Sequence, residues 1–375
     1  MAEASSDSAK KRHQFGLLLI AVWTILLVGV YAAIGSAAYR AQAEARRAAV
    51  DGHAERMDPT RLESGLTEAD LPPAAGAIPV KSGIYLDRIV ALSMPEVSWT
   101  ADFYLWFSWT GHPELDPGAN FQVVDGWIDS KELADSYHEG EVHYQLYRVV
   151  ATITKSFTVT RFPLDDHLLT INIENTGLER GQMVFVADTD SSGVSSRVKV
   201  PGYGIMPSER PIILEKAHAY KSTRGDPRLA AGTRSIHSQL RLGVHLARED
   251  WGYFWKLFQA LYIAVAISML VFFIKPTDVD PRFGLGVGAL FAAVANSYVS
   301  SSLIPQSGVS TLTDMINGLG AFTILLTVCQ STISLYIYGI LEEEEMSRIF
   351  DRTSFVVFVA GYLGVNLLLP YAAAL

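Results

Sequence analysis

The stretch TRFPLDDHLLTINIE, residues 160–174, places two aspartates one residue after a Phe-Pro pair. The residues from His167 to Glu174 are mostly apolar or β-branched and predict a strand, while the proline favours a corner before it. Asp165 and Asp166 therefore lie at the tight end of a predicted hairpin. Carboxylates in that position are either solvated in an Asx-type turn or pressed against another part of the protein, where desolvation requires a cationic partner.

The chain as a whole is too apolar for an ordinary soluble enzyme, because 49% of its 375 residues are hydrophobic. A helix needs about 20 apolar residues to cross the core of a bilayer. Five apolar runs are long enough, at residues 15–37, 257–274, 283–304, 315–341 and 354–375. We therefore expect an integral membrane protein with a large polar domain between its first and second runs.

The basic residues predict how the chain is oriented, because cytoplasmic loops are enriched in Lys and Arg. No Lys or Arg lies between Arg282 and Arg348, so the loop that joins the third and fourth runs is expected outside. Counting back from that loop places the N-terminus in the cytoplasm and the polar domain and the C-terminus in the periplasm. The expected location is a bacterial inner membrane, crossed several times.

The first apolar run has two interpretations. Small residues in GSAAYRAQA are compatible with the cleavage site of a signal peptide. Its apolar core is longer than the about 7–15 residues of such a peptide, which favours a retained membrane anchor.

Composition and motifs exclude several functions. The net charge of −9 offers no basic face for nucleic acid. The single cysteine, Cys329, lies in the fourth apolar run, so no disulfide is expected in the polar domain. We find no nucleophile–base spacing, phosphate loop or metal signature that argues for an enzyme, and we expect neither an enzyme nor a cofactor.

From residue 83 onward the apolar residues recur with the period of two that is typical of strands. Two clear examples lie in DFYLWFSW and SQLRLGVHLA, whose apolar faces are Phe103, Leu105, Phe107 and Trp109, and Leu240, Leu242, Val244 and Leu246. Turn signals such as SYHEG and STRGDPR separate such segments about every ten residues, which is typical of an antiparallel sandwich.

The expected fold class is therefore an all-β extracellular sandwich plus a four-helix transmembrane bundle, preceded by an N-terminal membrane anchor helix. We assign residues 1–38 to a cytoplasmic tail and anchor, 39–82 to a helical extension and linker, 83–250 to the sandwich and 251–375 to the helices.

Several motifs of this chain resemble those of the pentameric ligand-gated ion channels. The family carries a Phe-Pro-(Phe/Leu)-Asp-x-Gln signature, and Phe162 to His167 departs from it only at the last position. The strand ADFYLWFSW is similar to the family's second strand, RED before WGYFW to the entry of its first pore-domain helix, and SSLIP to the Ile-Pro that ends its pore-lining helix. The absence of loop cysteines matches the bacterial members. An anchor helix and a first pore-domain helix without a central proline are departures from the family.

The resemblance implies an ion channel that is a homopentamer in the lipid bilayer, opened by a small-molecule or proton agonist and permeated by inorganic ions. It also implies that Arg248 bridges the loop carboxylate of Asp165 and an acid of the first hairpin, matched here by Glu96. The residues that couple the sandwich to the helices would then be Glu96, Phe162, Pro163, Asp165, Arg248 and Pro305.

The third apolar run is rich in Gly, Ala and Ser, and one stripe along it has helical spacing. The stripe consists of Asp280, Gly284, Gly288, Phe291, Ala295, Tyr298 and Ser302. One interpretation is a packing face, because Gly284 and Gly288 form a G-x-x-x-G pattern. In a pentamer the same stripe would line the pore, with Phe291 as a hydrophobic gate and Asp280, or Asp278, as a cation-favouring ring. Similar proteins point the basic residue matched by Arg282 away from the pore.

The remaining candidate sites have weaker patterns. Trp127, Tyr144 and Tyr220 are candidates for an intersubunit ligand pocket, and the resemblance implies that residues 220–235 occupy the place of the family's ligand-capping loop. Asp188 and Asp190 are either calcium ligands or part of a polar turn. His138, His143 and His167 are either proton sensors or ordinary surface residues.

Two functions remain open from the sequence. The first is a cation-favouring ligand-gated channel, and the alternative is a non-conducting membrane receptor of the same fold, whose anchor helix or cytoplasmic loops pass on the signal.

Overall fold

The computed structural model describes residues 2–62, 66–72, 76–206, 212–220, 222, 227, 230, 234–248, 251–305 and 308–374. The chain divides into two compact units. We call residues 1–48, 159–165 and 250–375 the helical unit, and residues 49–158 and 166–249 the two-sheet unit. Residues 159–165, which carry the Phe-Pro pair, thus cluster with the helices and not with the strands that flank them.

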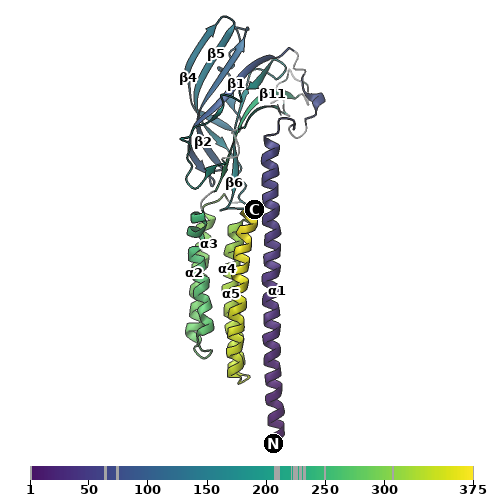
Figure 1. The fold of residues 1–375 in the computed structure, drawn as a ribbon, viewed down its shortest axis with the longest axis vertical. Helices are drawn as coiled ribbons and strands as arrows, with labels where there is room; N and C mark the ends of the chain where they lie inside the picture. The colour runs from purple at the N-terminus through teal and green to yellow at the C-terminus, as the bar shows by residue number, and fades with distance from the viewer. Residues whose placement is uncertain are drawn as a thin grey trace. The chain divides into compact units, whose positions relative to one another are not determined.

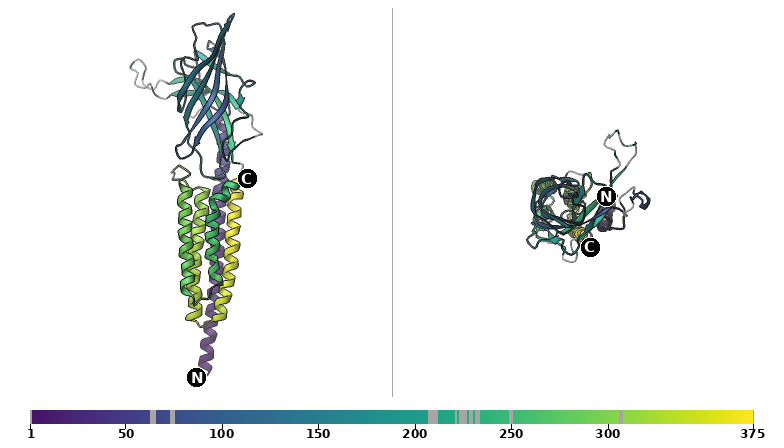
Figure 2. Two further views of the ribbon diagram at one scale, coloured as in Figure 1. Left: turned by 90° about the vertical axis from the view of Figure 1, so that its left-hand side faces the viewer. Right: turned by 90° about the horizontal axis from the view of Figure 1, so that it is seen from above.

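The helical unit contains five helices that are long and apolar enough to cross a membrane. They are α1 (Ala2–Arg56, of which residues 49–56 belong to the two-sheet unit), α2 (Trp251–Met269, extended by the short η2, Leu270–Phe273), α3 (Val279–Ser301), α4 (Leu312–Gly339) and α5 (Glu344–Ala374). The four C-terminal helices lie side by side in both side views (Figures 1 and 2), with α2 against α3 and α4, and α4 against α5. These apolar helices suggest a membrane protein, as expected from the sequence.

The first helix packs against the fifth through aromatic rings. Tyr31 of α1 lies edge-on to Phe358 of α5, with 6.3 Å between the ring centroids, and its hydroxyl is 3.0 Å from Thr323 Oγ1 of α4. A Cβ atom on Gly361 would lie 2.5 Å from the Tyr31 ring, so this position of α5 requires glycine. Within the helical unit, α1 is therefore a packed element and not a loose tether.

The two-sheet unit begins with the last residues of α1, from residue 49 onward, and contains two sheets. Its elements are η1 (Glu68–Asp70), β1 (Ile78–Ser93), β2 (Ser98–Thr110), β3 (Phe121–Val123), β4 (Gly126–Glu139), β5 (Val142–Thr154), β6 (Asp166–Asn175), β7 (Met183–Ala187), β8 (Gly193–Val194), β9 (Gly204–Ile205), β10 (Ile212–Tyr220) and β11 (Ser235–Ala247). The six-stranded sheet has the order β4-β5-β2-β1-β7, with β8 paired to β1. The five-stranded sheet has the order β10-β11-β6-β3, with β9 paired to β11. The pairs of β1 with β7 and β8 are parallel, and the other pairs are antiparallel.

The alternation read from the sequence is confirmed in β2 and β11. All eight residues predicted to face inward are buried. The Phe107 ring of the six-stranded sheet lies 5.8 Å from that of Phe121 in the five-stranded sheet, so aromatic side chains join the two sheets. This core contains no cysteine, and burial of apolar surface at about 25 cal/mol per Å² is its main stabilisation.

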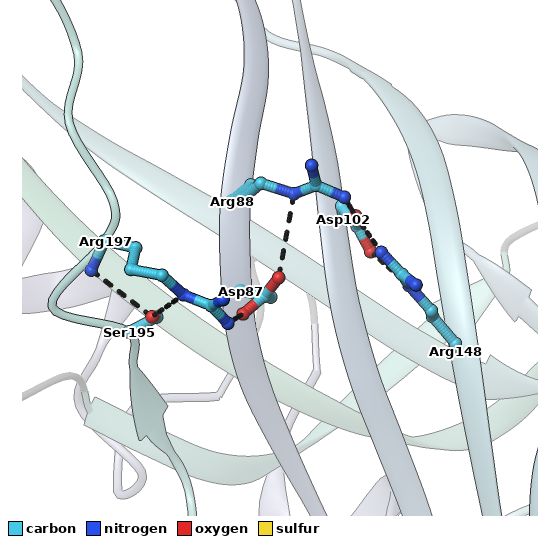
Figure 3. Close-up of polar contacts among 6 residues, drawn as sticks. All are labelled: Asp87, Arg88, Asp102, Arg148, Ser195 and Arg197. Carbon is cyan, nitrogen blue, oxygen red and sulfur yellow. Dashed lines mark hydrogen bonds and ion pairs between the residues drawn. The ribbon is translucent and has the colours of Figure 1, made fainter.

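A β-bulge organises the charges on the six-stranded sheet (Figure 3). The register shifts between Leu86 and Arg88, and this extra residue brings Arg88 opposite Asp102 of β2. The buried Asp102 carboxylate accepts hydrogen bonds from Arg88 at 2.5 Å and from Arg148 of β5 at 2.9 Å. Asp87, in the bulge itself, is paired with Arg197. The bulge thus places two carboxylates among three arginines.

We expect the Asp102→Asn substitution to lower the free energy of unfolding by about 1–3 kcal/mol, because it removes two charge-assisted hydrogen bonds. Hydrogen bonds from Arg148 hold the pKa of Asp102 below its usual range, with burial opposing them and Arg88 adding to them. A lowered pKa contributes stability above the ordinary aspartate pKa, and that stability is lost as the pH falls through the lowered value. Thermal unfolding followed by tryptophan fluorescence should therefore show a difference from the wild type at pH 7 that narrows in acid. Glu139→Gln, at an exposed position of the same sheet, should leave the midpoint unchanged at both pH values, and an equal effect of the two substitutions would contradict the assignment.

Candidate functional site

The predicted stripe on α3 is exposed along its whole length in the single chain. All seven of its residues are exposed, and Phe291 and Tyr298 reach 72% and 80% of their full accessible area. A Cβ atom built on Gly284 or Gly288 would meet no other atom within 4 Å. Among the described residues of this chain, no helix covers these glycines, so the packing interpretation is not met within one chain.

The opposite face of α3 packs against the rest of the helical unit. Its buried residues are Arg282, Gly286, Ala289, Ala293 and Ser300. A Cβ atom on Gly286 would come within 2.5 Å of Val328 of α4, so the glycine of α3 that permits close helix packing is Gly286. On the packed face a glycine therefore allows α4 to approach closely, whereas the glycines of the exposed stripe contact no other helix among the described residues of this chain.

Arg282 is the clearest marker of the packed face. Its side chain is 1% exposed and donates hydrogen bonds to the carbonyl of Ile274 at 2.6 Å and to Asp351 Oδ2 of α5 at 2.5 Å. The other oxygen of Asp351 accepts a hydrogen bond of 2.6 Å from Gln330 of α4. The basic residue at the start of α3 thus points away from the exposed stripe, while Asp280, in the first turn, remains exposed.

The Phe-Pro loop, residues 159–165, contacts four helices of the helical unit. The Thr160 carbonyl accepts hydrogen bonds from the backbone N–H of Leu312, which begins α4, at 2.8 Å and from Gln42 Nε2 of α1 at 3.3 Å. The Phe162 carbonyl accepts a hydrogen bond of 2.9 Å from Thr313 Oγ1.

Two further contacts complete this docking. The buried Phe162 ring lies 6.1 Å from that of Tyr253 in α2, and Arg161 donates a hydrogen bond of 3.1 Å to the carbonyl of Ala373 in α5. The peptide bond between Phe162 and Pro163 is cis. The loop is therefore packed against the apolar helices, and a change in its position would alter its contacts with α1, α2, α4 and α5.

The two aspartates of the loop have different surroundings. Asp165 belongs to the helical unit and is 1% exposed, so the solvated-turn interpretation does not describe it. Its carboxylate interacts electrostatically with Arg161. Burial lowers the pKa of Arg161, and the negative charge of Asp165 opposes this lowering only in part. Asp166 begins β6 in the two-sheet unit. Arg161 lies four residues before Asp165, whereas the cationic partner predicted from the sequence was Arg248 alone.

The other three predicted coupling residues lie in turns or directly after helices or strands. Arg248 follows β11, and its guanidinium lies 4.3 Å from the centroid of the Tyr203 ring. Glu96 is exposed in the β1–β2 turn and forms no ion pair with any residue that the structure describes, and its backbone N–H donates to Ser93 Oγ at 3.3 Å. Pro305 is half-buried after the end of α3. The link from Glu96 through Arg248 to Asp165 stays a prediction.

The three candidate ligand-binding aromatics lie on different strands. Tyr144 of β5 stacks on Tyr137 at 5.0 Å and lines a surface pocket of about 540 Å³, beside residues such as Tyr104. Trp127 of β4 is exposed, and its indole N–H donates to Asp129 at 2.9 Å. Tyr220 of β10 donates to the buried Glu174 at 2.8 Å. The pocket lined by Tyr144 includes neither Trp127 nor Tyr220, and most of the predicted capping loop 220–235 lies outside the described residues.

The predicted calcium pair lies in a turn after β7. Asp188 is buried, is 3.2 Å from Lys81 Nζ and accepts a hydrogen bond of 3.2 Å from Trp106, whereas Asp190 is exposed. Burial opposes the charge of Asp188, but hydrogen bonds from Lys81, Ser191 and Trp106 outweigh it and hold its pKa below the usual range. Lys81 therefore already supplies the positive charge that a cation would bring.

The three histidines suggested as proton sensors differ in burial. His138 and His143 are neighbours on the β4–β5 hairpin, with 6.3 Å between their ring centroids, and His138 is exposed. His167 is buried in the two-sheet unit between the rings of Phe157 and Tyr203, so it is not the surface residue that the sequence allowed.

The end of α1, residues 49–56, is fastened to the five-stranded sheet within the two-sheet unit, and no sequence pattern predicted this contact. Lys216 of β10 donates to the carbonyl of Glu55 at 3.3 Å, and Arg241 of β11 donates to that of Arg56 at 2.9 Å. Cationic groups that bind the last carbonyls of a helix stabilise its negative end. Met57, directly after the helix, packs with Leu168 and Leu214.

Compared with models of known protein families, the chain matches none, and no curated protein is significantly similar to it.

Proposed function

We propose that the protein is a homopentameric ion channel of a bacterial inner membrane, with its pore lined by the exposed stripe of α3. The observation that carries the proposal is the contrast between the two faces of this helix. Five of the seven residues of this stripe are Asp, Gly, Ala or Ser, and the other two are Phe291 and Tyr298. A face that is mostly small or polar fits the wall of a shared pore better than contact with lipid. Asp280, at the inner mouth, would favour cations.

The same proposal gives the two-sheet unit the role of a periplasmic β-sandwich that binds the agonist, a small molecule or a proton. The Phe-Pro loop would pass its movement to the helices, because this loop contacts α1, α2, α4 and α5. The four C-terminal helices would form the transmembrane bundle of each subunit. The resemblance of the motifs from Phe162 to His167 supports this division of roles.

Conduction is tested with purified full-length protein in a planar bilayer. In a Cys329→Ser background, Ala295→Cys should make the current sensitive to a charged, membrane-impermeant thiol reagent, because Ala295 would face water in the pore. Leu290→Cys, at an exposed position of α3 off the stripe, should remain insensitive. Block of both variants, or of neither, would contradict the assignment of the stripe.

The alternative function is a non-conducting receptor whose first helix carries the signal. One observation favours it: α1 is a single helix from Ala2 to Arg56, and its last turn is held by Lys216 and Arg241 of the five-stranded sheet. The absence of any current from protein that is folded and inserted in the bilayer would favour this receptor over the channel.

The proposed link between Asp165 and Arg248 predicts energetic coupling. We expect Asp165→Asn and Arg248→Gln each to lower the thermal midpoint, and the double variant to be less destabilised than the sum, with a coupling of about 0.5–3 kcal/mol. Pairing Asp165→Asn with Arg197→Gln, whose arginine contacts Asp87, provides the control and should be additive. Additive effects for Asp165 and Arg248 would contradict the link.

A further inference from the structure

Three side chains of the kind that bind metals meet in the two-sheet unit. His53 lies in the last turn of α1, Asp166 begins β6 and His245 lies near the end of β11. Ala247 pairs with Asp166, so His245, two residues earlier on the same strand, lies on the same face of the sheet as Asp166. None of these residues has a place in the proposed channel mechanism.

The distances between their ligand atoms are short. His245 Nε2 lies 2.9 Å and His53 Nδ1 lies 3.5 Å from Asp166 Oδ2, and one ligand atom from each residue falls within 4.8 Å of the others. The two imidazole rings are 5.0 Å apart. Ligand atoms around a tetrahedral zinc ion, with bonds of about 2.0–2.2 Å, lie about 3.3–3.6 Å from one another. Small side-chain movements would therefore suffice to complete such a shell.

The surroundings of His53 also indicate a missing partner. Its side chain is 18% exposed, and its Nδ1 atom is buried without a hydrogen-bond partner among the residues that the structure describes. Buried polar atoms are almost always satisfied in folded proteins, by protein groups, water or an ion. A metal ion bound at Nδ1 would satisfy this atom.

We propose that His53, Asp166 and His245 bind a divalent transition metal of the zinc type and thereby fasten the last turn of α1 to β6 and β11. Two imidazoles and one carboxylate suit zinc, cobalt or nickel, whereas calcium and magnesium prefer a shell of oxygen ligands. Three protein ligands leave one coordination position for water. Lys155 and Arg56 lie near enough to interact with His53 electrostatically, so we expect weaker binding than in a closed four-ligand site.

The test uses the full-length protein without a histidine tag, purified in detergent and stripped with a chelator. Cobalt(II) is titrated in and followed by its visible absorption, and zinc is then added in competition. We expect one cobalt ion per chain, intense bands that indicate tetrahedral coordination, and displacement by zinc. Binding is read without any current, so failure of the channel proposal and failure of this one are distinguishable.

Matched variants assign the ligands. His53→Gln and Asp166→Asn should each weaken cobalt binding at least tenfold, while His138→Gln, at an exposed histidine of β4, should bind like the wild type. Cys329→Ser should also bind normally, which excludes the single thiol as a ligand. Absence of saturable binding to the wild type, or unchanged binding in His53→Gln, would overturn the proposal. His53 lies at the end of a helix, so its variant is expected to fold even where one in β11 does not.

Discussion

Replacing Phe291 by alanine should raise the current that flows without agonist about tenfold or more, the change produced when a barrier falls by about 1.4 kcal/mol. Phe291 is the bulkiest apolar side chain of the stripe, with glycines before it and alanine after it. A ring of five such side chains would exclude water from the closed pore, and alanine would let the constriction stay wet. The measurement is the resting current of the purified protein in a planar bilayer.

The control for this prediction is Leu290→Ala on the neighbouring position of α3. Leu290 is also an exposed apolar residue, but it points about 100° away from Phe291 around the helix. Its truncation should leave the resting current near that of the wild type. An unchanged current in Phe291→Ala, or an equal rise in both variants, would contradict the assignment of Phe291 as the gate.

Replacing Arg282 by alanine should destabilise the helices by about 3–5 kcal/mol, the cost of leaving one member of a buried ion pair without its partner. Arg282 and Asp351 are both buried, and the arginine also binds the carbonyl of Ile274. We expect a markedly lower thermal midpoint in detergent and a reduced yield of folded protein.

Two variants decide whether this loss comes from the unpaired charge. Arg352→Ala removes an exposed arginine from α5, one residue beyond Asp351, and should change stability by less than about 0.5 kcal/mol. Combining Arg282→Met with Asp351→Leu removes both charges and should restore part of the stability, because no buried charge is left unpaired, while the Ile274 carbonyl and the Gln330 amide lose these partners. Equal midpoints for Arg282→Ala and Arg352→Ala would contradict the assigned role of the pair.

The regular parts of the fold could be predicted because burial leaves a period in the sequence. Leu240 to Leu246 alternate in β11 as a strand with one buried face must, and the apolar run 283–304 corresponds closely to α3. The segment 126–139 carries no such period, because β4 is an edge strand whose side chains are mostly exposed. For that reason only the turn at its end could be predicted from the sequence.

The candidate site was predictable only where one helix carries it. Asp280, Phe291 and Tyr298 share a face by spacing alone, and the structure leaves that face exposed. Contacts between distant segments leave no comparable pattern. His53, Asp166 and His245 are separated by long stretches of chain, and Arg161 gave no sign that it reaches the end of α5. Helical spacing cannot reveal either group, since each depends on how separate elements pack.

The central claim is that α3 faces a pore shared by five copies of the chain. A map of the purified full-length protein, obtained by electron microscopy in a lipid nanodisc, tests this most directly. The account predicts five subunits around a central opening, with Phe291 and Gly288 on the helix nearest the axis. A single chain without an opening, or α3 turned with these residues towards lipid, would contradict it.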